Sequence, residues 1–221
     1  MSEDLDPRAA GEVYTEGARL EDAAGVVILL HGRGGSAEDI LSLAGELGGA
    51  ELRLTFHAPQ AAGSSWYPNS FLAERESNEP WVSSALAKVS SVVELAVAAG
   101  IPRERIVVGG FSQGACLATE FVATHPARYA GLIAWTGGLI GPLGSDISHT
   151  GDLGGMPAFQ SGGDPDPHVP WSRVEESAKV LTAMGAQVAT RRYPGKPHSV
   201  SAEEVTLARE LIEAAFVDNR V

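Results

Sequence analysis

The chain has 221 residues, which is enough for one large domain with a full hydrophobic core. It carries 28 acidic and 16 basic residues, so its formal net charge is −12. This charge argues against nucleic-acid phosphates and anionic membrane surfaces as partners, because both would be repelled.

Three further features of the sequence predict a soluble, cytoplasmic protein. The single cysteine, Cys116, can form no internal disulfide, which fits a reducing compartment. Residues 1–11 are acidic and polar, without the basic and apolar regions of a signal peptide, and we expect them to be flexible. The longest apolar run, residues 23–30, is too short to span a bilayer.

Short β-branched apolar runs alternate along the chain with longer stretches of helical periodicity. The predicted strands are residues 13–20, 26–30, 52–57, 106–110, 131–135, 158–161 and 188–193. The predicted helices are residues 37–47, 80–99, 113–124, 170–184 and 202–217, the last starting at a capping box of Ser201 and Glu204. This order predicts a single α/β domain over residues 1–221. Its mostly parallel sheet of about seven strands is covered by helices on both faces.

Four polar segments follow directly after predicted strands. They are HGRGG at 31–35, the turn around Ser112, SGGDPDPHVP at 161–170 and YPGKPHSV at 193–200. Ligands of open α/β sheets gather outside the carboxyl ends of the strands. We therefore expect the four segments to converge on one rim of the sheet.

The segment VVGGFSQGACLATEF at 107–121 places Ser112 between Gly110 and Gly114. This spacing is weak evidence by itself, and a plain turn would also explain it. Its position between an apolar strand and an apolar helix is typical of a nucleophile elbow, in which glycines permit a tight turn and the serine points up from the sheet. We interpret Ser112 as a nucleophile, and Cys116 as a buried helix residue and not a reactive thiol.

A serine hydroxyl needs a base to take its proton, and His198 is the best candidate among the six histidines. It follows the last predicted strand in a short loop punctuated by proline and glycine, and it precedes the final helix. The others are interpreted as a structural loop residue (His31), element-boundary residues (His57 and His125), a loop residue without an anchoring pattern (His149) and a residue that lines the pocket (His168).

The base in turn needs an acid that orients it, and Asp164 and Asp166 compete for this role. Asp166 lies between two prolines that stiffen the loop, whereas Asp164 sits closer to the strand, where it could cap a turn. Asp166 is favoured. The resulting chain order of serine, aspartate and histidine is that of the α/β-hydrolases.

The four segments LLHGRGG, RIVVGGFSQGACLA, GGDPDPHVP and YPGKPHSV, in this order, resemble those of a known family. It is the phospholipase/carboxylesterase group of α/β-hydrolases, which includes acyl-protein thioesterases and bacterial carboxylesterases, and the resemblance runs over about residues 26–216. It implies a serine hydrolase of carboxylic esters or thioesters, with Ser112, Asp166 and His198 as a catalytic triad. It also implies an oxyanion hole formed by the backbone N–H groups of Arg33 and Gln113.

Three further side chains near this site each have two possible roles. The thioesterase branch usually carries an apolar residue where Arg33 stands. Its guanidinium either pairs with a surface carboxylate, which is favoured, or attracts an acidic group on the substrate. Trp66 and Tyr67, in a polar loop beyond a strand end, are either core residues or part of the pocket wall. We take both, with His168, as substrate-binding residues.

The sequence thus predicts a carboxylesterase that acts on small soluble esters of short to medium acyl chain. The alternatives are a thioesterase or lysophospholipase and, in another class, a non-catalytic ligand-binding homologue. No metal or organic cofactor is expected, since there is no Cys/His cluster for zinc and no dinucleotide phosphate loop. The expected partner is a small-molecule ester, with no nucleic acid and no stable membrane association. A homodimer remains open.

Overall fold

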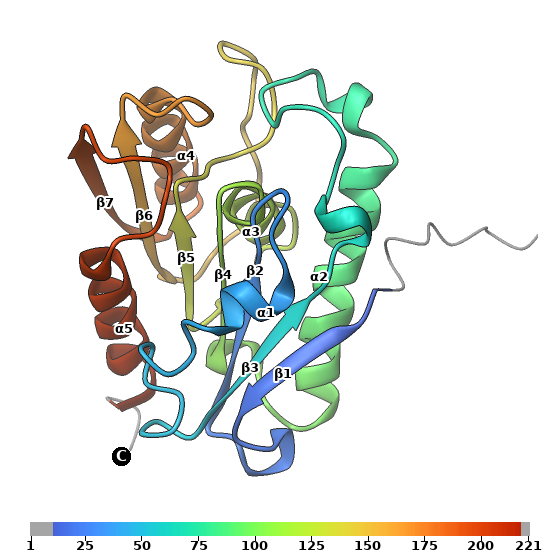
Figure 1. Cartoon of the computed structure of the whole chain (residues 1–221), viewed down its shortest axis with the longest axis vertical. Coiled ribbons are helices and arrows are strands. Elements are labelled where there is room, and N and C mark those ends of the chain that lie inside the picture. Colours follow the sequence, from blue (N-terminus) through green and yellow to red (C-terminus); the bar gives the residue numbers. More distant parts are fainter. Residues whose placement is uncertain (1–10, 218–221) are drawn as a thin grey trace, which may run out of the picture.

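The computed structural model describes residues 11–217, in which seven strands form one sheet (Figure 1). The strands are β1 (Val13–Gly17), β2 (Gly25–Leu30), β3 (Leu54–Pro59), β4 (Ile106–Phe111), β5 (Gly131–Trp135), β6 (Pro157–Asp164) and β7 (Gln187–Pro194). Their order across the sheet is β1-β3-β2-β4-β5-β6-β7, and only the β1–β3 pair is antiparallel. The predicted mostly parallel sheet is confirmed.

Helices cover both faces of this sheet. They are α1 (Ala37–Leu41), α2 (Trp81–Ala98), α3 (Gln113–Thr124), α4 (Trp171–Ala183) and α5 (Ala202–Val217). Short 3₁₀ turns lie at Leu20–Asp22, Ala62–Ser64, Arg75–Asn78 and Arg103–Arg105. In Figure 1, α1 and α5 lie on the near face, whereas α2, α3 and α4 lie behind the sheet.

The alternation of side chains along the central strands divides the core into two layers. In β2, Val26, Ile28 and Leu30 pack into the layer with α2, α3 and α4, whereas Val27 and Leu29 pack into the layer with α1 and α5. All five side chains are fully buried. A strand that is buried on both faces explains why the sequence shows a continuous apolar run there.

Two predicted elements are shorter than expected by three residues or more. The first strand stops at Gly17, whose φ of +91° turns the chain, and a Cβ there would lie 2.3 Å from the Leu54 carbonyl oxygen. The helix predicted over 37–47 ends at Leu41 and continues as turns, because Gly45, Gly48 and Gly49 disfavour helix. The flexibility expected of residues 1–11 concerns positions that, apart from residue 11, lie outside the described part.

Helix α2 is the one helix of the described residues that is long and apolar enough to cross a membrane by length and composition. It packs against the sheet through a stripe that includes Val82, Leu86, Val89 and Val93, all buried. An amphipathic core helix passes the same test of composition, so the packing accounts for its hydropathy.

Candidate active site

Ser112 stands at a sharp turn between β4 and α3. Its backbone has φ 55° and ψ −117°, a strained conformation for a residue with a side chain, and its N–H donates to the Trp135 carbonyl at 3.0 Å. A Cβ on Gly114 would lie 2.1 Å from the Leu30 carbonyl oxygen, and one on Gly110 would lie 2.5 Å from it. Only glycine therefore fits on either side of the serine, as expected for a nucleophile elbow.

The structure brings Ser112, His198 and Asp166 together at the carboxyl ends of β4, β7 and β6. The distance from His198 Nε2 to Ser112 Oγ is 2.8 Å, and that from His198 Nδ1 to Asp166 Oδ2 is also 2.8 Å. These contacts form one continuous chain from carboxylate to imidazole to hydroxyl. A proton on Nδ1, facing the carboxylate, leaves the Nε2 lone pair directed at the serine hydroxyl.

Asp166 is held as an anion by its loop. Burial would raise the pKa of this carboxyl, but the N–H groups of Val169 and His168 donate to Oδ1 at 2.8 and 2.9 Å. These bonds, with the contact to His198, outweigh burial and lower the pKa below its ordinary value. Asp164 contacts Arg192 instead, and its carbonyl accepts the Gly195 N–H. The geometry thus places Asp166, which the sequence favoured over Asp164, against His198.

The loop that carries His198 is fixed to the sheet by the buried carboxylate of Glu204. Lys196 Nζ lies 2.6 and 2.8 Å from its two oxygens, and Ser161 Oγ on β6 donates to Oε1 at 2.6 Å. Ser201 donates its N–H to Oε2 at 2.8 Å, which completes the predicted capping box of α5. Strand, loop and helix therefore meet at one carboxylate, which limits the movement of the imidazole.

A cavity of about 510 Å³ opens beside Ser112 and His198. The residues that line it are Arg33, Tyr67, Pro68, Asn69, Ser70, Phe71, Leu72, Ser112, Gln113, Cys116, Pro167, His168, Val169 and His198. His168 and Tyr67 are thus placed as the sequence predicted, and the His168 ring meets His198 edge-on at 4.9 Å between centroids. Burial raises the pKa of the Cys116 thiol to about 12, which keeps it protonated.

The structure corrects the prediction for Trp66, which does not line the cavity. Its indole is buried and donates from Nε1 to the His31 carbonyl at 2.9 Å. His31 itself accepts the Ala61 N–H on Nε2 at 3.1 Å, and burial lowers its pKa. Trp66 and His31 therefore help to fix the loop after β2. His31 thus has the structural role expected of it.

Arg33 and Gln113, the residues of the predicted oxyanion hole, both lie at the cavity. Both line the cavity next to Ser112, and among the described residues neither backbone N–H donates to a protein acceptor. Gln113 is the first residue of α3, where unpaired N–H groups and the helix dipole favour negative charge. The oxyanion hole itself stays a prediction.

The amide side chain of Gln113 has a role that the sequence did not indicate. Its Oε1 accepts the Trp66 N–H at 3.0 Å, and its Nε2 donates to the Tyr67 carbonyl at 2.8 Å. The amide is buried. One residue of α3 thus fixes the loop whose residues 67–72 form a wall of the cavity, the wall segment. The only signal in the sequence was a polar residue at the start of an otherwise apolar helix.

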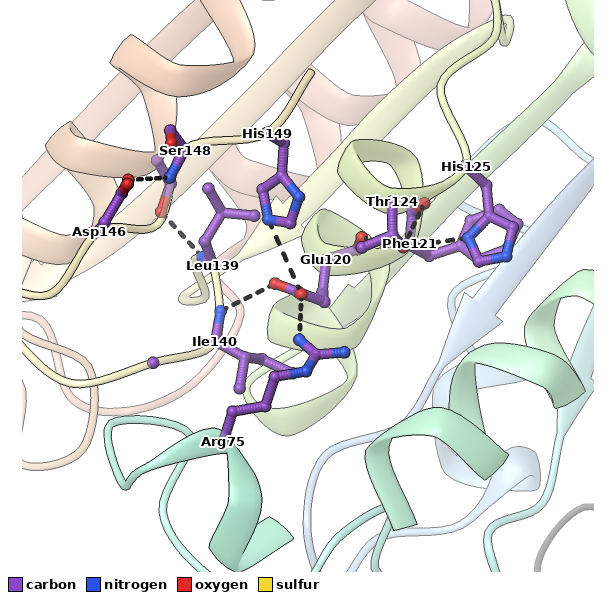
Figure 2. Close-up of polar contacts among 12 residues, drawn as sticks. Arg75, Glu120, Phe121, Thr124, His125, Leu139, Ile140, Asp146, Ser148 and His149 are labelled. Atoms are coloured by element: carbon purple, nitrogen blue, oxygen red, sulfur yellow. Dashed lines mark hydrogen bonds and ion pairs between the residues drawn. The ribbon is translucent and has the colours of Figure 1, made fainter. Parts of the chain in front are cut away.

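A second anchor for this wall is the buried carboxylate of Glu120 on α3, shown in Figure 2. One oxygen contacts the guanidinium of Arg75, which follows the wall segment, and the other accepts the Ile140 N–H at 3.1 Å. His149 Nε2 lies 3.8 Å from the carboxylate. Gly141, which follows Ile140 in the chain, donates its N–H to the carbonyl of the cavity residue Phe71 at 2.8 Å.

Arg173 on α4 binds residues 139–142, the segment that also contacts Glu120. This fully buried guanidinium donates to the carbonyls of Leu139, Gly141 and Pro142 at 2.6 to 2.9 Å. Within residues 139–142, the Glu120 carboxylate thus accepts a backbone N–H, and the Arg173 guanidinium donates to backbone carbonyls. These bonds satisfy the backbone polar groups of a segment without regular secondary structure, which bonds in turn to the Phe71 carbonyl.

In the described residues, no group of three or more His, Cys, Asp or Glu side chains is placed to hold a metal ion. What the site can do follows from its geometry. A hydroxyl on a strained turn, an imidazole in contact with it and a buried carboxylate behind the imidazole define the serine hydrolases of the α/β-hydrolase fold. The chain belongs to the phospholipase/carboxylesterase family, whose model matches residues 17–216.

Solved structures agree with this assignment. The chain is 45% identical to a phospholipase/carboxylesterase from Dyadobacter fermentans, with a TM-score of 0.86 over 91% of this chain and 96% of that one. A carboxylesterase from Bacillus cereus is 21% identical, with a TM-score of 0.73 over 95% and 97% of the two chains. The second likeness shows the fold alone.

Curated relatives include acyl-protein thioesterase 1 of Gibberella zeae. It is 32% identical over 119 residues, which are 52% of this chain and 50% of the relative. Across this thioesterase and three others, from further fungi, the match covers between 49% and 66% of the relative's length.

Proposed function

We propose that the protein is a serine carboxylesterase that hydrolyses small soluble esters of short to medium acyl chain. The observation that carries this proposal is the unbroken chain of contacts from Asp166 through His198 to Ser112 beside an open cavity. A non-catalytic binding protein would not need a strained serine aligned with a base and an acid.

In the proposed mechanism, Ser112 Oγ attacks the ester carbonyl carbon while its proton moves to His198 Nε2. The backbone N–H groups of Arg33 and Gln113 stabilise the negative oxygen that forms. When the tetrahedral intermediate collapses, the ester C–O bond breaks and the alcohol leaves with the proton from His198. Water then attacks the acyl-enzyme, gives its proton to His198, and the carboxylic acid departs as Ser112 takes that proton back.

Labelling with a fluorophosphonate, followed by a panel of esters of rising acyl length, tests the proposal. We expect labelling of the wild type at Ser112 and turnover of short and medium esters. Matched thioesters in the same panel test the alternative that the family's thioesterases suggest. A wild-type protein that is neither labelled nor active on any panel member would leave only the ligand-binding alternative.

The pH profile tests the role of the imidazole. His198 must be neutral to accept the serine proton, so kcat/KM is expected to rise with pH. The pKa of Asp166 lies below the ordinary value of 3.8, so its carboxylate stays ionised from about pH 5 to 8. It therefore adds no step of its own to the profile. The measurement is kcat/KM for a neutral ester in constant-ionic-strength buffers. A flat profile from about pH 5 to 8 would count against histidine as the base.

The surroundings of the cavity support the proposed preference for small esters. Residues 136–156, between β5 and β6, contain no helix that could form a lid. Among the described residues, the exposed large hydrophobic side chains are Leu95 and Leu143, which provide no continuous apolar surface for a lipid interface. We expect activity to fall as the acyl chain lengthens, with no rise when a long-chain ester forms micelles. Kinetics across the critical micelle concentration measure this, and a jump there would refute it.

A further inference from the structure

The charge of the cavity is opposite to that of the protein. The chain has a formal net charge of −12, yet no Asp or Glu is among the described residues that line the cavity. Apart from the histidines, its one ionisable basic group is Arg33. The Asp166 carboxylate lies behind His198, fully shielded from solvent. An anion that enters the cavity therefore meets a positive group and no facing carboxylate.

The guanidinium of Arg33 is fixed in place by neutral acceptors. Its Nη1 donates to Ser65 Oγ at 3.1 Å and to the Pro68 carbonyl at 2.9 Å, and its Nη2 donates to the Asn69 carbonyl at 2.7 Å. Within residues 11–217 it makes no ion pair with a carboxylate, contrary to the interpretation that the sequence favoured. These three bonds orient the group without cancelling its charge.

Part of the guanidinium is also free to bind a ligand. Of its five N–H donors, three are used in these contacts, and the Nε–H and one Nη2–H donate to no acceptor among the described residues. The side chain is exposed at the cavity. A carboxylate with two oxygens is the natural partner for a planar cation with donors to spare.

We propose that Arg33 makes this cavity an anion-selective subsite, and that the preferred substrates are short esters that carry a second, free carboxylate. This inference deepens the proposed ester hydrolysis and rests on it. The backbone N–H of Arg33 is assigned to the ester oxygen, while its side chain receives the carboxylate. Because both belong to one residue, the two ends of the substrate are only a few bonds apart, as in a half-ester of a small dicarboxylic acid.

Two esters of matched shape test the proposal. Monoethyl glutarate ends in a carboxylate, and ethyl 5-methylhexanoate replaces that carboxylate with an isopropyl group. The readout is the ratio of their kcat/KM values, which cancels any general effect of a substitution on the nucleophile or the oxyanion hole. We expect the wild type to favour the half-ester by about 10- to 100-fold, the range of a hydrogen-bonded charged contact. Added salt should reduce that ratio.

Three variants locate the preference. Arg33→Met should bring the ratio close to one, and Arg33→Lys, which keeps the charge but loses the planar fork, should retain part of it. Arg19→Met removes the same charge from an exposed position outside the cavity and should leave the ratio unchanged. A wild-type ratio of one or below would overturn the proposal. So would an Arg33→Met variant that loses activity on both esters in equal proportion.

A binding measurement separates this proposal from the proposed activity. Calorimetric titration of glutarate into Ser112→Ala protein should show binding that Arg33→Met, added to that variant, weakens by about 10-fold or more. If no ester is hydrolysed and fluorophosphonate does not label the protein, the proposed activity fails, while glutarate binding that depends on Arg33 still supports the anion subsite. Glutarate that does not bind, or binds independently of Arg33, overturns the subsite even if the esterase activity is established.

Discussion

Ser112→Ala is expected to lower kcat by about 10⁶-fold while the protein stays folded. The substitution removes the atom that would attack the ester, and the binding groups that remain supply only residual catalysis. Its cost in stability is small, because the serine side chain lines the cavity and, among the described residues, its hydroxyl contacts only His198. Single-turnover and steady-state assays on a short ester measure the loss, and circular dichroism checks the fold.

The matched control is Ser65→Ala, which also removes a hydroxyl beside the cavity but touches no member of the proposed triad. Its hydroxyl accepts from Arg33 and donates to the Tyr67 carbonyl. A loss comparable to that of Ser112→Ala is not expected. Near-wild-type activity of folded Ser112→Ala protein would remove the basis for the whole assignment.

Asp166→Asn is expected to lower kcat by about 10⁴-fold. The amide oxygen can still accept the N–H groups of His168 and Val169, so the loop keeps its shape. The amide nitrogen, however, faces His198 Nδ1 as a donor, which favours the tautomer with the proton on Nε2. His198 Nε2 could then no longer accept the serine proton. Steady-state kinetics at neutral pH measure the effect.

Asp164→Asn is the control for this prediction, since Asp164 is the competing carboxylate that the sequence favoured less than Asp166. In the structure it loses only a partly exposed contact with Arg192, worth less than about 1 kcal/mol. We expect little change in kcat. A larger loss from Asp164→Asn than from Asp166→Asn would reassign the acid without affecting the fold.

The sequence was informative where the physical signal is local. The Gly-x-Ser-x-Gly turn lies between an apolar strand and an apolar helix, and both glycines prove to be required by contacts with the Leu30 carbonyl. Strand β5 and helices α3 and α5 have the predicted bounds, because clear apolar periodicity ends at a cap or a turn residue. The order of polar segments after strands then sufficed to place the candidate triad on one rim.

The sequence was silent where the determining contact is long-range. Trp66 and Tyr67 are neighbours in an irregular loop, and no periodicity indicates that one packs under His31 while the other faces the cavity. The Gln113 amide binds a loop 46 to 47 residues away, and Glu120 binds a segment 20 residues away. Such contacts depend on the assembled sheet. For the same reason, the sequence could not show that Arg33 is held by carbonyls and not by a carboxylate.

The bonds of Gln113 impose a constraint on anyone who wishes to redesign this cavity for bulkier acyl groups. Substitutions at Trp66 or Tyr67 that move their backbone will strain the side-chain amide of Gln113. The backbone N–H of the same residue is the one assigned to the oxyanion. Acceptance of a larger substrate would then be gained at the expense of the chemical step. Leu72 lines the same cavity and has no bond to that amide, so engineering is better begun there.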